Sequence, residues 1–258
     1  FFWFLDLIEI WDSDALQAFL ETLPPADTAR AISRLDEEDQ SRLFTLLDPE
    51  DAVALIEELS DIQGVDIVED LPVSQAALIF EEMESDERAD LLAEMDPVDA
   101  EAILARMSPE EAADTRELLE YEPDTAGGIM ITEFVSYPES MNVGDVLNDF
   151  RTNAEVYSDY RVQYAYVVSE AGRLIGVLVL RDLLLSAPSL SIKNVMIPNP
   201  IAVPDEMDVD ELVHLFDRYS FGALPVIDED GIPVGVVRRG DAEEVLGEIA
   251  ERSVMQFS

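Results

Sequence analysis

The sequence contains no cysteine, one lysine and one histidine among 258 residues. Without cysteine the chain can form no disulfide, no thiolate metal site and no thiol nucleophile. The most apolar opening, FFWFLDLIEI at residues 1–10, is too short and too acidic for a membrane-spanning helix or a signal peptide. We therefore expect this stretch to be a domain edge, a cloning remnant or a partner-binding strip, and the chain by itself to be soluble.

The residues of common enzyme active sites are also missing. His214, the single histidine, lies within DVDELVHLFDRY, where its neighbours have the periodicity of an ordinary amphipathic helix. The sequence shows no nucleophile–base pair and no Gly-rich phosphate-binding loop. We predict that the chain is not an enzyme.

What the chain has in abundance is negative charge. Fifty-eight Asp and Glu face fifteen Lys and Arg, which gives a net charge of −43, and residues 1–125 hold 36 of the acids with only six arginines. Such a surface repels nucleic acid and anionic lipid. The remaining explanations are bound cations, basic partners or a surface adapted to salt, and a cation site is expected first in the N-terminal half.

The N-terminal half repeats a short helical unit. Its prolines recur at intervals of 24, 23, 25 and 12 residues: Pro25, Pro49, Pro72, Pro97 and Pro109. Asp48, Asp96 and Ser108 precede their prolines as N-caps, and proline at the first helical position loses no hydrogen bond. Helices of about 12 residues are marginal alone and must stack. The period of about 24 residues per helix pair predicts a right-angle superhelical stack of short α-helices.

The predicted stack should have an apolar core and an acidic face exposed to water. The residues expected in its core are Leu43, Leu46, Leu47, Val53, Leu55, Ile56 and Leu59. The acids expected to face water are Glu37, Glu38, Glu57, Glu58, Glu81, Glu82 and Glu84. Asp96 and Asp99 lie three residues apart at one helix start and should point the same way, which makes them a weak candidate metal pair.

From about residue 129 the sequence changes to short strands and helices, and this pattern occurs twice. FVSYPESMNVGDVLNDFR aligns with PIAVPDEMDVDELVHLFDR, and AYVVSEAGRLIGVLVLRDLL aligns with LPVIDEDGIPVGVVRRGDAEEVL. Residues 164–168 and 175–180 are predicted to be short buried strands joined by a Gly-containing hairpin turn. Two such copies resemble a tandem pair of CBS domains, a Bateman module whose halves pack through their sheets around a pseudo-twofold cleft.

In CBS domains a Gly-x-x-Thr/Ser-x-x-Asp turn often holds a nucleotide ribose. The copies here read GVLVLRD and GVVRRGD, so Asp182 and Asp241 match while Val179 and Arg238 replace the hydroxyl. The resemblance implies a site for ATP or another adenine nucleotide in which the hydroxyl ligand is missing. Its expected residues are Tyr164, Arg181, Asp182 and Phe221. The two aromatic rings could sandwich a base, although an aromatic residue on a CBS strand is more often part of the core.

An acidic helical stack, the junction EPDTAGGIM and two CBS repeats together resemble the cytosolic region of the MgtE family of magnesium channels and transporters. The resemblance implies an α domain followed by an α/β Bateman module: helical domain 1–122, hinge 123–128, CBS repeats 129–190 and 191–252, and a tail 253–258 that leads toward a connecting helix. In the junction, Gly127 and Gly128 are expected to adopt conformations closed to other residues.

The same resemblance implies the function. It predicts a homodimer formed through the CBS domains, attached to a transmembrane pore on the cytoplasmic side of a bacterial inner membrane. Mg²⁺ would bridge carboxylates between the domains and between subunits, compact the dimer and close the pore. The candidate ligands are Asp96, Asp99, Asp208, Asp210, Asp241 and Glu244. Ser220, Gly247, Ile249 and Arg252 occupy stretches where relatives often carry acids, which implies fewer Mg²⁺ sites here.

Two alternatives remain open. A free-standing CBS protein that senses adenine nucleotide would bind nucleotide without compacting on Mg²⁺. A surface adapted to salt would need high ionic strength of any kind and would show no preference for Mg²⁺ over Na⁺.

Overall fold

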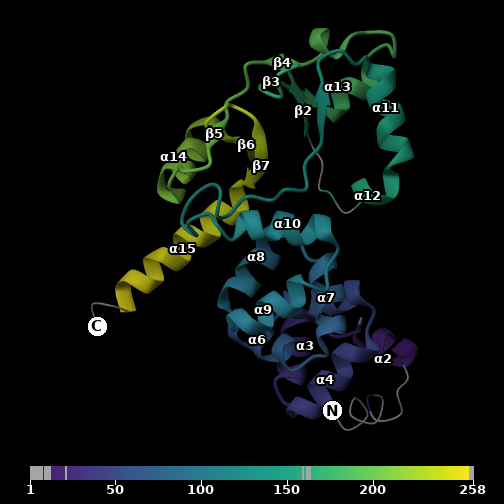
Figure 1. Ribbon diagram of the computed structural model, residues 1–258, viewed down its shortest axis with the longest axis vertical. Coiled ribbons are helices and arrows are strands. Elements are labelled where there is room, and N and C mark those ends of the chain that lie inside the picture. The colour runs from purple at the N-terminus through teal and green to yellow at the C-terminus, as the bar shows by residue number, and fades with distance from the viewer. Residues whose placement is uncertain (1–7, 9–12, 21, 159, 161–163, 256–258) are drawn as a thin grey trace. The chain divides into compact units, whose positions relative to one another are not determined.

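The computed structural model describes residues 8, 13–20, 22–158, 160 and 164–255. It divides into two compact units, Phe1–Leu119 and Glu120–Ser258 (Figure 1). Each unit has its own core. Apart from Ile8, the opening stretch 1–10 lies outside the described residues, so its predicted role stays a prediction.

The first unit is made of short helices. The described ones are α2 (Ser13–Leu20), α3 (Pro25–Ile32), α4 (Glu37–Leu46), α5 (Pro49–Ile56), α6 (Asp61–Glu69), α7 (Val73–Glu82), α8 (Ser85–Glu94), α9 (Pro97–Leu104) and α10 (Pro109–Leu118). From α4 onward each helix packs against the helix two places further along the chain, as in the pairs α5–α7, α6–α8 and α8–α10. This alternation confirms the predicted stack of short helices.

The predicted helix starts are correct, although their caps differ in detail. Proline occupies the first helical position of α3, α5, α9 and α10. The side chain of Asp96 accepts a hydrogen bond from Val98 N, and that of Ser108 accepts one from Glu111 N. Asp48 is the N-cap residue of α5 but makes no side-chain capping bond.

The predicted core residues of this unit are buried or packed against its core, whereas the prediction of its acidic, water-facing residues is wrong in part. Glu81 and Glu84 were expected in water, but both are half-buried. Glu81 accepts a hydrogen bond from the backbone N–H of Ser108, at the start of α10. Its physical role is to satisfy a helix-terminal donor that has no partner within its own helix.

An ion-pair network around one buried arginine joins α8 to α10. Arg88, only 1% exposed, contacts Oε2 of Glu111 at 2.6 Å and Oδ2 of Asp114 at 3.4 Å. Its guanidinium also donates to Phe80 O. Because breaking a buried pair leaves a charge without compensation, this network fixes α10, the last helix before the junction, on the stack.

The second unit contains two small sheets with helices around them. Its elements are β1 (Ser136–Pro138), α11 (Val143–Thr152), α12 (Ala154–Ser158), β2 (Tyr164–Val168), β3 (Leu174–Val179), α13 (Leu180–Leu185), η1 (Ile192–Asn194), β4 (Ile197–Pro198), β5 (Val203–Pro204), α14 (Val209–Tyr219), β6 (Ala223–Ile227), β7 (Pro233–Arg238) and α15 (Arg239–Met255). The strand orders are β1-β2-β3-β4 and β5-β6-β7. In each sheet the first pair is parallel and the next antiparallel.

The two sheets confirm the predicted internal repeat. Strand β2 has the predicted bounds, and β3 begins one residue before the predicted start of its strand. The hairpin turns contain Gly172 and Gly231, whose φ angles of 79° and 80° require glycine. Side chains of both repeats share one apolar cluster around Ile131, Tyr166 and Val236.

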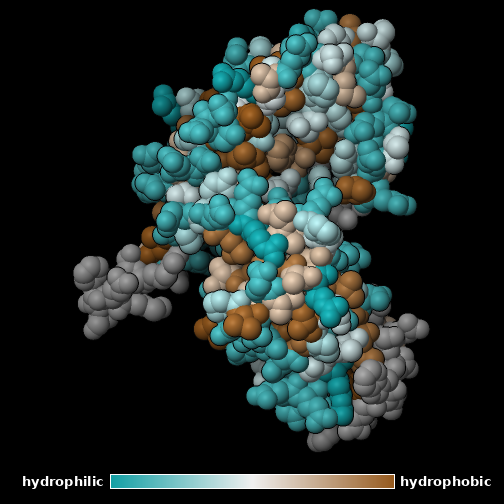
Figure 2. All heavy atoms as spheres, viewed as in Figure 1, coloured by the Kyte–Doolittle hydropathy of each residue, from teal (hydrophilic) through white to brown (hydrophobic). Residues whose placement is uncertain are grey.

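Figure 2 shows hydrophilic residues over much of the visible face of both units, with smaller apolar areas between them. Among the described residues, no helix is both long and apolar enough to cross a membrane.

Candidate functional site

The first pair of candidate ligands lies at the start of α9. Asp96 and Asp99 are both exposed. Asp96 is tied to its own helix by the capping bond to Val98 N at 2.8 Å, and its backbone N–H donates to Oε1 of Glu69 at 2.9 Å. The position of Asp96 is therefore fixed from α6, while Asp99 lies in the first helical turn.

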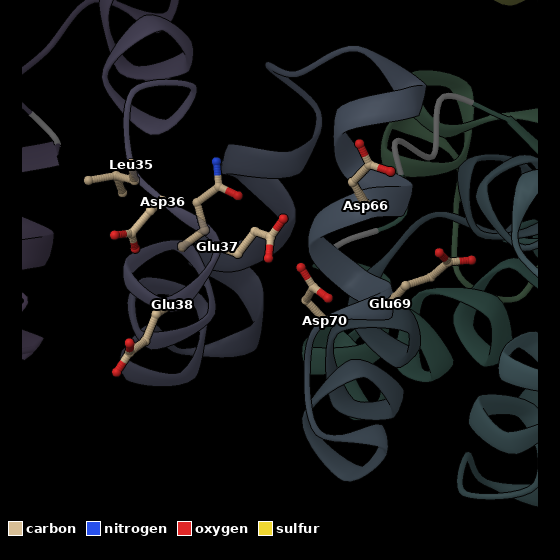
Figure 3. Close-up of a pocket in the computed structure, with 8 residues that line it drawn as sticks. Leu35, Asp36, Glu37, Glu38, Asp66, Glu69 and Asp70 are labelled. Atoms are coloured by element: carbon tan, nitrogen blue, oxygen red, sulfur yellow. The ribbon is translucent and has the colours of Figure 1, made fainter.

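An open acidic pocket of about 830 Å³ lies between the start of α4 and the end of α6, and Glu69, the acceptor of the Asp96 N–H, is one of its lining residues. Its lining residues are Leu35, Asp36, Glu37, Glu38, Gln40, Asp66, Glu69 and Asp70. Figure 3 shows the carboxylates of Glu37 and Asp70 directed toward the space between the two helices, whereas those of Glu38 and Glu69 point away from it. Six carboxylates around one open hollow concentrate counter-ions from solvent.

The second pair lies at the start of α14 in the second repeat. Asp208 is the N-cap residue of this helix and Asp210 lies in its first turn, and both are exposed. Nε2 of His214 lies 3.8 Å from Oδ2 of Asp210, with the histidine side chain 77% exposed. His214 is thus a surface residue of an amphipathic helix, as its neighbours in the sequence predict.

The third pair lies at the start of α15, the long helix that ends the described chain (Figure 1). Asp241 is half-buried and accepts a 2.5 Å hydrogen bond from Nε of Arg238, whereas Glu244 is exposed one turn further along. Among the candidate ligands of the second repeat, Asp241 thus has a closer contact with a basic side chain than Asp210, which lies 3.8 Å from His214. Within the described part of the chain, no group of three or more acids or histidines is gathered tightly enough to hold a metal ion.

The candidate nucleotide-binding residues lie on different parts of the CBS pair. Tyr164, at the start of β2, packs partly buried against the apolar cluster shared by the two repeats. Phe221 instead stacks on Tyr219 of α14, with ring centroids 5.6 Å apart and planes inclined by 15°. Arg181 and Asp182 contact each other at 3.3 Å in the first turn of α13, with side chains 80% and 43% exposed. The sandwich of the two rings around a base stays a prediction.

The junction YEPDTAGGIM is held to the second repeat by backbone hydrogen bonds. The N–H groups of Ala126 and Gly127 donate to Met207 O and Asp205 O, each at 2.8 Å. Ile131 follows the junction and exchanges two 2.9 Å hydrogen bonds with Val236 of β7. Residues 124–131 thus belong structurally to the second repeat, a role that the sequence prediction missed.

The first repeat uses residues 190–197 in the same way. Val143 N–H donates to Leu190 O, as Val209 N–H donates to Asp124 O. Ser191 pairs with Asn142 in an isolated antiparallel bridge, and the corresponding bridge joins Thr125 to Asp208.

The side-chain packing repeats as well. A Cβ added to Gly176 or to Gly235 would lie 2.3 or 2.5 Å from the sulfur of Met196 or Met130, respectively. Each repeat is therefore completed by the segment that precedes the other one. Aligning DTAGGIMI with LSIKNVMI, which share the Met-Ile pair, is the sequence signal that reveals this exchange.

The prediction for the paired glycines needs a correction. Neither Gly127 nor Gly128 has a positive φ. A Cβ on Gly127 would lie 2.4 Å from the Tyr121 ring, and one on Gly128 would lie 2.2 Å from Glu122 O. Close packing of the chain on itself, rather than a special backbone conformation, requires glycine here.

Comparison with known proteins defines the class of this fold. Residues 23–124 match the MgtE intracellular N domain, and residues 126–188 and 192–248 each match the CBS domain. The chain is therefore a CBS-pair protein with a helical domain in front of the pair.

Two solved structures resemble almost the whole chain. One is the cytosolic domain of the Mg²⁺ channel MgtE in complex with ATP, which is 33% identical with a TM-score of 0.82 and covers 93% of this chain and 97% of that one. The other is the soluble part of a magnesium transporter, which is 28% identical with a TM-score of 0.83 and covers 96% of each chain. This chain belongs to the MgtE family.

Curated relatives are longer than the matched region. The magnesium transporter MgtE of Thermus thermophilus is 40% identical over 134 residues, which is 52% of this chain and 29% of that protein. The magnesium transporter MgtE of Bacillus subtilis is 30% identical over 148 residues, which is 57% of this chain and 32% of that protein. The match thus spans about a third of the length of these relatives.

Proposed function

We propose that this chain is the Mg²⁺-sensing regulatory region of a magnesium transporter or channel on the cytoplasmic side of a membrane. In the proposal, Mg²⁺ bridges carboxylates of the helical unit and the CBS unit, and carboxylates of two subunits joined through their CBS domains. The compact, ion-bound dimer holds a transmembrane pore shut. The observation that carries the proposal is the presence of paired carboxylates at the starts of α9, α14 and α15, on both units, all of them exposed except the half-buried Asp241.

The carboxylates suit this ion. Mg²⁺ keeps most of its water and is usually held by one or two protein carboxylates, so facing acidic surfaces can capture it without a closed cage. Asp96, Asp99, Asp208, Asp210 and Glu244 offer such oxygens at the surface, and Asp241 offers one beside Arg238. The ligands are supplied in pairs, which is enough for a hydrated ion that bridges two surfaces.

The free energy needed for the switch can come from a few weak sites. A site with a dissociation constant of about 1 mM contributes about 4 kcal/mol. Moving a two-state equilibrium from 1:99 to 99:1 takes about 5.5 kcal/mol of differential binding. Two or more such sites that fill only in the compact state therefore suffice, and the charge of −43 supplies the repulsion that opens the assembly when Mg²⁺ is low.

We place the pivot of this movement upstream of the predicted hinge 123–128. Residues 124–131 are hydrogen-bonded to the second repeat, and Arg88 fixes α10 on the helical stack. Tyr121 and Glu122 pack against Gly127 and Gly128, so a change of direction is left to Leu119 and Glu120, where the two units meet in the chain. Movement of the helical unit would then reach the second repeat beside Asp208, which pairs with Thr125 of the junction.

Adenine nucleotide is a second proposed ligand. The solved relative in complex with ATP supports this class of ligand. Of the two aspartates that end the Gly-x-x-x-x-x-Asp turns, Asp182 is more exposed than Asp241. The ribose would lie against Asp182, since a carboxylate can accept hydrogen bonds from a pair of hydroxyls.

Ion titrations distinguish the Mg²⁺ sensor from a salt-adapted surface and from a nucleotide-sensing CBS protein. Mg²⁺ and Na⁺ at matched ionic strength should be titrated while amide chemical shifts of α9, α14 and α15 are followed. Saturable shifts with Mg²⁺ alone support the sensor. Equal responses to both ions would identify a salt-adapted surface, and a response to ATP without one to Mg²⁺ would identify a nucleotide-sensing CBS protein.

A further inference from the structure

A side chain of the protein already provides a positive charge at one of the candidate Mg²⁺ ligands. Nε of Arg238, the last residue of β7, lies 2.5 Å from Oδ2 of Asp241 in the first turn of α15. The two side chains are only 19% and 26% exposed. A short, charge-assisted hydrogen bond with limited access to water is stronger than an ordinary surface pair.

The equivalent turn of the first repeat lacks this contact. Val179, at the position equivalent to Arg238, carries no charge. Asp182 instead contacts the adjacent Arg181, whose Nε lies 3.3 Å from Oδ1 of Asp182. The side chain of Arg181 is 80% exposed, so its pair with Asp182 is weak. The repeats thus have the same carboxylate at the same turn, and only the second has a partly buried guanidinium against it.

We propose that Arg238 is an internal counter-cation that Mg²⁺ must displace from Asp241, so that Arg238 sets the Mg²⁺ concentration at which the α15 site fills. The inference rests on the proposed function, since it concerns the occupancy of the same site. Two cations next to one carboxylate repel each other, and the carboxylate gains less from Mg²⁺ when it already has a partner. Arginine stays charged at every pH at which the protein is folded, so its own contribution to the threshold does not vary with pH.

Glu244 makes the exchange of partners feasible. It lies one turn further along α15 and is exposed, so a hydrated ion can first meet this carboxylate and then reach Asp241 as the guanidinium turns away. Replacing one cation by another leaves Asp241 compensated in both states, whereas removing Arg238 leaves Asp241 dependent on Mg²⁺.

The test is a Mg²⁺ titration of the 258-residue chain at constant ionic strength, followed by the amide shift of Asp241. R238M should lower the midpoint by about tenfold, which corresponds to about 1.4 kcal/mol. R238K keeps the charge and should stay nearer to the wild-type midpoint. R181M removes the matched, exposed arginine of the first repeat and should leave the midpoint unchanged. In R238M/D241N the Mg²⁺-dependent change in the amide shift of residue 241 should be lost.

A second readout covers the case in which R238M changes the structure. Without Mg²⁺, R238M should melt below the wild type, and added Mg²⁺ should raise its melting temperature more than that of the wild type. If wild type and R238M bind Mg²⁺ with equal midpoints and equal thermal gains, the inference fails while the sensor function stands. If only R238M binds Mg²⁺, the inference holds and the sensor function fails for this site. If neither binds, both fail.

Discussion

The backbone N–H of Asp96 donates a 2.9 Å hydrogen bond to Oε1 of Glu69, a residue 27 positions earlier in the chain. The N–H of Ser108 makes the same contact with Glu81, again across 27 residues. Two acids at the ends of α6 and α7 thus satisfy donors at the starts of α9 and α10. Part of the abundant negative charge has a structural role that recurs with the helical repeat.

Removing these acceptors should weaken the helical unit. We expect E69A and E81A each to lower the free energy of unfolding by about 0.5–1.5 kcal/mol, the usual contribution of one hydrogen bond. The measurement is urea unfolding followed by far-UV circular dichroism. The exposed Glu58 provides the matched control, and E58A should change the free energy by less than about 0.5 kcal/mol. Equal effects of all three substitutions would mean that these acids act only through general repulsion.

A half-buried acid in α8 should make this unit sensitive to pH. Burial, together with the carboxylates of Glu57, Asp86 and Glu84, raises the pKa of Glu87 to about 8 from the ordinary value of 4.5. An acid whose pKa is raised on folding contributes stability that is complete below pH 4.5 and is lost as the pH rises through about 8. The contribution of Glu87 to the free energy of unfolding should therefore fall across this range.

The variant E87Q isolates that contribution. Glutamine mimics the neutral acid, so E87Q should be nearly as stable as the wild type at the acidic end of the range and more stable at the alkaline end. The control E58Q removes one exposed carboxylate and should shift stability by a similar small amount at both ends. Parallel pH curves for E87Q and the wild type at constant salt would contradict the raised pKa.

The junction should behave as part of the second repeat. Amide exchange at Ala126, Gly127 and Ile131 should be slow both with and without Mg²⁺, because each N–H is hydrogen-bonded. Fast exchange at these positions in the absence of Mg²⁺ would show that the hinge lies within the junction and not upstream of it.

A glycine substitution tests the packing of the same segment. In G128A the new methyl group would meet Glu122 O at 2.2 Å, and we expect a loss of about 1–3 kcal/mol in stability. Gly247 lies within α15 with nothing within 4 Å of a Cβ, so G247A should be neutral or slightly stabilising. A G128A variant as stable as G247A would contradict the packing described for the junction.

The sequence predicted the elements better than their contacts. Proline at helix starts and apolar runs bounded by glycine are local signals, and they located α9 and β2 correctly. The capping of Asp96 by Glu69 depends on how helices 27 residues apart stack, which no local pattern contains. The pair of Arg238 and Asp241 has a simple spacing, but the contact requires the turn from β7 into α15, so the sequence suggested a missing hydroxyl and not a counter-cation.

If Mg²⁺ compacts this chain through its carboxylates, small-angle scattering against Mg²⁺ at constant ionic strength should detect it. We expect the radius of gyration to fall as Mg²⁺ rises through the millimolar range. We also expect Asp→Asn changes at Asp96, Asp99, Asp208 and Asp241, made in turn, to weaken the response. A radius of gyration that stays flat up to about 20 mM Mg²⁺, more than ten times the expected site constant, would contradict compaction by Mg²⁺.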